Sequence, residues 1–150
     1  MWLICWGPSM PVNHRPRKKY RPKPINAPVT DGLVKMFSDC LSVAELGLHL
    51  RAPTTDHFDS IAAALNVIGP VAIDRLGDAN SNAAAITSAA QAMNEAADRA
   101  AQGDGRMTDA ELASVTRGIS AAMDALPLLD IRSLYRQHYQ VLRRQVAGAV

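Results

Sequence analysis

The chain has 150 residues, of which 48% are apolar and 5% aromatic, and its formal net charge is +2. A chain of this length builds one domain around one core, and abundant alanine with few aromatic residues disfavours a β-sheet. The two cysteines, Cys5 and Cys40, lack CxxC spacing, which excludes a disulfide framework or a zinc site, so we expect free thiols in a reducing compartment.

The first predicted element is a basic arm over residues 1–29. It contains six prolines, six lysine and arginine residues and no acid. Because proline fixes φ and lacks a backbone donor, we expect the arm to be extended and disordered. The apolar run at residues 1–6 is too short for an export signal or a membrane span, so we interpret residues 1–9 as an upstream extension before Met10. An apolar tip that touches a membrane is the alternative.

Residues 30–150 are predicted to form a compact, all-α bundle of four to five helices. Caps and helix breakers place these helices at about residues 31–51, 54–77, 80–102, 108–126 and 128–146. Gly69-Pro70 predicts a kink or a break in the second helix, and Pro127 separates the fourth helix from the fifth.

The apolar stripes predict that the first, second, fourth and fifth helices supply the core. The first helix is expected to be buried on more than one side, because it carries a second apolar edge, Val43, Leu46 and Leu50. The stripe of the fifth helix includes Leu134, Tyr135, His138, Leu142 and Val146. The third helix is rich in alanine and is expected to bury little area; it is either the least stable element or one completed by a partner.

The arm carries the main candidate binding site, six cations and a tyrosine within ten residues. They are Arg15, Arg17, Lys18, Lys19, Tyr20, Arg21 and Lys23. Cations on an extended backbone neutralise phosphates and release counterions, and a tyrosine can stack on a base. We therefore expect the arm to bind nucleic acid. An acidic protein surface, including the acidic middle of this chain, and a tail that only aids solubility are the alternatives.

A second candidate surface lies on the fifth helix, where residues 131–150 hold four arginines and no acid. Arg132, Arg136 and Arg143 share one face of this helix. This arrangement indicates a binding face, or cations that interact with the dipole at the helix C-terminus.

The sequence contains no GxSxG, GxGxxG or Walker A motif. The segment Asp78-x-Asn80-x-Asn82 lacks the glycine and the glutamate that an EF-hand loop needs. His49 and His57, near two aspartates, form only an unspecific metal-binding pattern, and His138 is expected to be a core or edge histidine. We therefore predict a protein that is not an enzyme and that has no cofactor and no metal.

The segment at residues 18–26, KKYRPKPIN, resembles the opening of short proteins encoded by phages and prophages of proteobacteria. Those proteins begin with a K-x-Y-R-P-K-P arm and continue as an all-helical body. A weaker resemblance covers residues 56–58, 65–66, 108–112 and 132–135. The resemblance implies a mobile genetic element in a bacterium as the setting and carries no assigned activity.

Three hypotheses for function follow. The favoured one is a small phage-type accessory protein in the cytoplasm of the bacterial host cell that binds nucleic acid or a nucleoprotein through its arm. The second is a protein-binding inhibitor or adaptor that acts on a host protein complex, such as defence machinery, with the acidic middle as a nucleic-acid mimic and the third helix as the contact surface. The third is a virion structural or assembly component, a homo-oligomer in which the arm links one subunit to the next.

Overall fold

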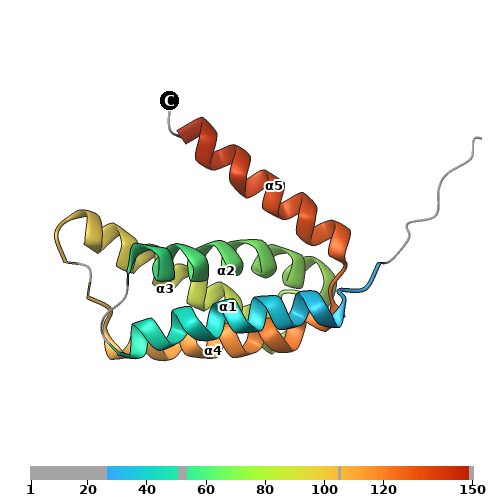
Figure 1. Cartoon of the computed structure of the whole chain (residues 1–150), viewed down its shortest axis with the longest axis horizontal. Coiled ribbons are helices and arrows are strands. Elements are labelled where there is room, and N and C mark those ends of the chain that lie inside the picture. The colour runs from blue at the N-terminus through green and yellow to red at the C-terminus, as the bar shows by residue number, and fades with distance from the viewer. Residues whose placement is uncertain (1–26, 51–53, 105, 149–150) are drawn as a thin grey trace, which may run out of the picture.

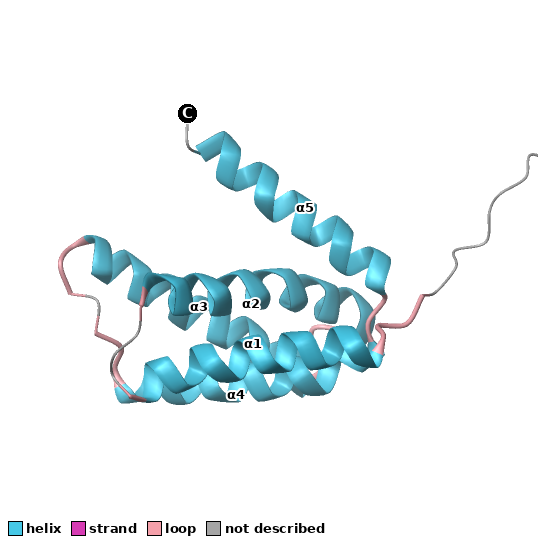
Figure 2. Cartoon of the chain, viewed as in Figure 1, coloured by secondary structure: helices cyan, strands magenta, loops and turns pink. Residues whose placement is uncertain are grey.

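The computed structural model describes residues 27–50, 54–104 and 106–148. Within these residues it contains five α-helices and a short 3₁₀ turn but no strand, which confirms the predicted all-α class (Figure 2). Helices α1 (Asp31–His49), α2 (Thr55–Leu76), α3 (Ser81–Ala101) and α4 (Asp109–Ala125) pack as a bundle. Helix α5 (Ile131–Gly148) starts at one end of the bundle and leaves it at an angle (Figure 1).

Each of the first four helices begins at a polar residue that the sequence marks as a cap. The side chains of Thr30, Thr54, Asn80 and Thr108 each accept a hydrogen bond from a backbone N–H in the first turn. These bonds satisfy donors that a helix start leaves free. Gly77, at φ 92°, ends α2 as predicted, because only glycine adopts that conformation at low cost.

An ion pair joins the end of α3 to the start of α4. Arg99 donates from both terminal nitrogens to the two carboxylate oxygens of Glu111, each at 2.6 Å. Glu111 also accepts from the backbone N–H of Thr108, which completes a capping box at the start of α4. The bonds from Arg99, and then those from Thr108, lower the pKa of Glu111 to about 2.

The sequence predicts a kink or a break in α2 at Gly69-Pro70, and the break is wrong, because the helix is continuous there. The helix continues to Leu76 with Pro70 inside it. Proline lacks the N–H that would bond to the carbonyl four residues earlier, which here belongs to Asn66. The side chain of Gln137, on α5, donates to that Asn66 carbonyl at 3.4 Å. The proline therefore leaves an acceptor on α2 that helps to hold α5.

Helix α3 is a full part of the core, which corrects the expectation that it buries little area. It buries Ala83, Ile86, Ala89, Ala92, Met93 and Ala96. On α4, Gly118 faces Ala89, and a methyl group at Gly118 would overlap the Ala89 methyl group. Small side chains on both helices thus allow a close approach, and the alanine face packs against α4 instead of remaining free for a partner.

Helix α5 contributes much less to the core than predicted. Of its residues only Leu134 is buried, whereas Tyr135, His138, Leu142 and Val146 are exposed. The helix follows a 3₁₀ turn, Leu126–Leu128, that contains Pro127, and it then diverges from α2 (Figure 1). The core is therefore formed by α1, α2, α3 and α4, with α5 attached at one end.

The second apolar edge of α1 is also exposed, contrary to the sequence-based expectation. Val43, Leu46 and Leu50 retain 63%, 57% and 68% of their accessible surface. The buried face of α1 consists of Leu41, Ala44, Gly47 and Leu48. Helix α1 is therefore buried on one side only.

Candidate functional site

The predicted arm site lies outside the described residues. This applies to Arg15, Arg17, Lys18, Lys19, Tyr20, Arg21 and Lys23. The structure does describe the point at which the arm joins the helical body, and it describes the second predicted surface, on α5.

The arm joins the body at the start of α5. The backbone N–H of Ala27 donates to the Asp130 carboxylate at 2.9 Å, and the N–H of Ile131 donates to the Ala27 carbonyl at 2.9 Å. Val29 is buried in the core. Residues 27–29, which the sequence assigns to the arm, are thus held against the segment between α4 and α5.

Asp130 links this junction to the first turn of α5. Its carboxylate also accepts from the Ser133 backbone N–H at 3.0 Å and from the Ser133 hydroxyl at 3.1 Å. The bond from Ala27, followed by those from Ser133, lowers the pKa of Asp130 below its usual range, and the charge of Arg132 acts in the same direction. One ionised side chain therefore caps α5 and holds the chain where the arm begins.

The predicted arginine face of α5 is exposed to solvent. At 100° per residue, Arg132, Arg136 and Arg143 fall within an arc of about 40° around the helix. All three side chains are exposed, and among the residues that the structure describes none of them forms an ion pair. The Arg143 guanidinium lies 5.9 Å from the centre of the Tyr139 ring. These cations are available to an anionic partner.

Beside the arginine face runs an exposed apolar stripe. Its members are Tyr135, Tyr139, Leu142 and Val146, which expose between 45% and 71% of their surface. They stand at i, i+4, i+7 and i+11, the spacing of a helix seam. Large apolar side chains gathered on a protruding helix indicate a contact surface for a macromolecule.

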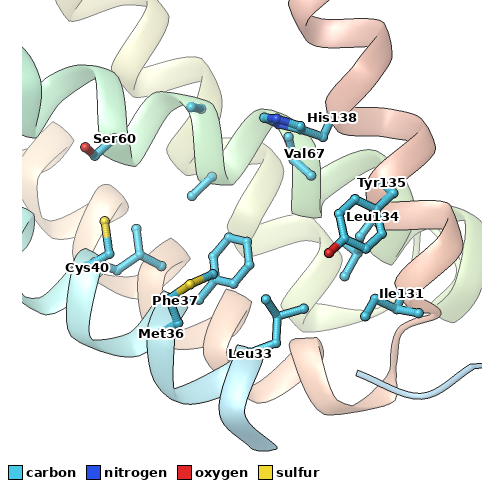
Figure 3. A pocket seen from close by; sticks show the side chains of 13 residues that line it. Leu33, Met36, Phe37, Cys40, Ser60, Val67, Ile131, Leu134, Tyr135 and His138 are labelled. Atoms are coloured by element: carbon cyan, nitrogen blue, oxygen red, sulfur yellow. The ribbon is translucent and has the colours of Figure 1, made fainter. Parts of the chain in front are cut away.

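An apolar groove lies between α1, α2 and α5 and shares Tyr135 with that stripe (Figure 3). Its volume is about 350 Å³. Leu33, Met36 and Phe37 line it from α1, and Ile131 and Leu134 line it from α5. Cys40, Ser60, Tyr135 and His138 supply the few polar atoms around it. The groove exists because α5 diverges from the bundle.

The histidines near the α1–α2 loop have local structural contacts. The ring of His57 accepts from the Thr54 backbone N–H at 3.2 Å and so completes the cap of α2. The ring of His49 lies 3.3 Å from the Thr116 hydroxyl and 3.7 Å from the Glu45 carboxylate. Among the described residues, no three His, Cys, Asp or Glu side chains are placed to hold a metal ion.

Sequence reasoning found the arginine face but missed the junction and the groove. The Asp-x-x-Ser pattern at residues 130–133 is a cap signal that could have located the start of α5. No pattern in the sequence gives the angle between α5 and α2, on which the groove depends.

No family model, no curated protein and no solved structure matches this chain. In the described segments no helix is both long enough and apolar enough to cross a membrane.

Proposed function

We propose that this protein is a small non-enzymatic accessory protein of the phage or prophage type. It binds nucleic acid or a nucleoprotein in the bacterial cytoplasm through its basic arm, and the arginine face of α5 extends the binding surface. The observation that carries this proposal is the junction at Asp130. Ala27 is bonded to Asp130, and Asp130 lies two residues before Arg132, so the arm joins the helical body next to the first residue of the arginine face.

The proposed contacts are mainly with phosphates. Lysine and arginine side chains that displace counterions produce affinity with little dependence on base sequence. Exposed arginines without an acidic partner lose no internal ion pair when they meet a phosphate, which favours this use of Arg136 and Arg143. Tyr139, beside Arg143, offers an aromatic ring on which a base can stack.

The test is a titration against duplex and single-stranded oligonucleotides at several salt concentrations. The logarithm of affinity falls with the logarithm of salt with a slope of about −0.9 per phosphate contacted on duplex DNA. Deletion of residues 1–24 removes six cations and should reduce the slope by up to about 5. An unchanged affinity and slope after this deletion would refute binding through the arm.

The contribution of α5 needs a variant with matched charge. R136Q/R143Q removes two cations from the arginine face, and R106Q/R117Q removes two exposed cations elsewhere in the body. We expect the first variant to reduce the slope by up to about 2 and the second to leave it nearly unchanged. Equal effects of the two variants would show that only the net charge of the protein affects binding. The α5 arginines would then be explained by their interaction with the helix dipole.

The exposed apolar stripe of α5 supports the second hypothesis, an adaptor or inhibitor that binds a host protein. Apolar side chains are not needed for phosphate contacts, whereas a helix seam suits another protein. If L142A and V146A abolish capture of a host complex but leave oligonucleotide binding intact, α5 has a protein partner as well. The same stripe could join subunits in a virion component, which light scattering would detect as an oligomer.

A further inference from the structure

The groove between α1, α2 and α5 is apolar and open to solvent, so an apolar segment that fills it would remove this surface from water. We propose that the groove is the docking site of the chain's own residues 2–6, Trp-Leu-Ile-Cys-Trp, which gives the segment interpreted above as an upstream extension a role in the protein. The apolar end of the arm would then lie against the helical body. The basic strip, residues 14–23, would connect this docked end to the junction at Ala27.

The chemistry of the groove suits such a segment. Its floor and walls are aliphatic and aromatic, from Leu33, Phe37 and Val67, and few polar atoms reach it. A volume of about 350 Å³ is at the lower end of the range for ligand pockets. It accommodates one indole ring with part of a neighbouring side chain, and burial of a tryptophan removes about 150–250 Å² from water.

The attachment point of the arm supports the same occupant. Ile131 lines the groove, and its backbone N–H is bonded to the carbonyl of Ala27. The arm therefore enters the body at the rim of the groove. The 20 residues from 7 to 26 can span up to roughly 60 Å at 3.1 Å per residue. The groove runs along about 10 Å of α5, at 1.5 Å per residue, so reach does not limit docking.

Attachment also raises the local concentration of the segment. A linker that can span the distance between its two ends gives an effective concentration of up to the order of millimolar. A contact that would be weak between separate molecules is then sufficient, and burial of apolar side chains such as Trp2 and Trp6 provides the driving force. A separate partner would have to compete against this intramolecular segment.

The two cysteines provide a direct test. Cys5 lies within the proposed segment, and Cys40 lines the groove and is exposed. Figure 3 shows the Cys40 side chain at the groove. Mild oxidation of the dilute full chain should therefore form an intramolecular Cys5–Cys40 disulfide, detected by mass spectrometry of the linked peptides. The C40S variant is the chemical control.

A variant that blocks the groove makes the test specific. Ala63 is exposed on the groove wall, and A63K places a charge there; A84K makes the same change at an exposed site on α3. We expect A63K to reduce disulfide formation at least fivefold and A84K to leave it unchanged. Because A63K alters the body, I4D provides a second variant that disrupts the segment alone and should have the same effect as A63K.

Tryptophan fluorescence gives an independent measurement, because both tryptophans of the chain lie in the segment. Because the groove accommodates one indole ring, we expect the wild-type and A84K emission to be partly shifted to the blue and partly protected from acrylamide. The A63K emission should resemble that of the unfolded chain. Emission and quenching that do not differ between wild type and A63K would overturn the proposal. Cys5–Cys40 links formed only between molecules would overturn it as well, and would identify a second copy as the source of the occupant.

One consequence rests on the proposed function, whereas docking itself does not. A docked segment restricts the basic strip, so deletion of residues 2–6 should tighten oligonucleotide binding severalfold. If docking is observed but no oligonucleotide binds, the proposed function fails while this inference stands. If oligonucleotides bind and neither disulfide nor fluorescence shift is found, the reverse holds.

Discussion

The contact between α3 and α4 makes a sharp prediction for Gly118→Ala. In an exposed helix this substitution stabilises by about 1 kcal/mol, because alanine has the higher helix propensity. Here the added methyl group would overlap the Ala89 methyl group and lie 3.2 Å from the Ala85 carbonyl. Neither neighbour is the end of a flexible side chain, so α3 must move.

The magnitude follows from these two opposing effects. Overpacking of a tight core costs roughly 1–3 kcal/mol, and a clash with a rigid neighbour belongs near the upper end. After subtraction of the propensity gain, we expect Gly118→Ala to lower the free energy of unfolding by about 2 kcal/mol. Gly32→Ala in α1 is the control, because a methyl group there would have no neighbour within 4 Å.

Urea unfolding followed by far-UV circular dichroism measures the effect. The double variant A89G/G118A moves the methyl group from α3 to α4 and restores the space between them. It should be more stable than the sum of the single effects predicts by at least about 1 kcal/mol, since contacting residues couple. If Gly118→Ala is as stable as the wild type and shows no coupling with Ala89→Gly, the close approach of α3 and α4 is wrong.

Three further predictions concern the ion pair, the proline and the attachment of α5. The folded-state pKa of Glu111, about 2, lies below its ordinary value of 4.5, so its ionised form stabilises the fold above pH 4.5 and this contribution is lost as the pH falls toward 2. The stability difference between wild type and E111Q should therefore narrow below pH 4.5, and a difference independent of pH would contradict the role of the Arg99 pair. Pro70→Ala should raise the free energy of unfolding in urea by about 2 kcal/mol. Proline costs about 3 kcal/mol in a helix, and the greater entropy of the unfolded alanine variant offsets a smaller part of that gain. A destabilised variant would show that the Gln137 contact contributes more than the restored helix hydrogen bond. Leu134→Ala should lower the free energy that holds α5 on the bundle by about 2–5 kcal/mol, because Leu134 is buried. Hydrogen-exchange protection should then be lost from α5 but not from α3. Leu142→Ala, at an exposed site, should change neither quantity.

Local features of this fold could be predicted from the sequence. Thr30, Thr54, Asn80 and Thr108 are caps whose hydrogen bonds involve only the following turn, so a short window of sequence contains all of the relevant partners. The class of the fold follows from the same kind of information, because helical spacing of apolar residues recurs in every segment after residue 30.

The relative burial of α3 and α5 could not be predicted in this way. The size of the apolar side chains suggested that α5 belongs in the core and α3 at its margin. The outcome is the reverse, because alanines on α3 and Gly118 on α4 allow the two helices to approach closely. This close packing compensates for the small apolar area of each alanine side chain. A stripe shows which face of a helix is apolar, but it does not show whether a neighbour covers that face.

The direction of α5 decides what this molecule can bind. Near its start the helix is held by Leu134, by the Gln137 bond to the carbonyl that Pro70 leaves free, and by the cap at Asp130. Beyond these contacts Arg143 and Val146 are open to solvent. A helix packed along its whole length on α2 would have closed the groove and covered the apolar stripe. The divergence of α5 therefore opens the groove and leaves the apolar stripe and the arginine face exposed. Because the Asp130 junction lies at the start of α5, the arm joins the body at the point where α5 begins to diverge.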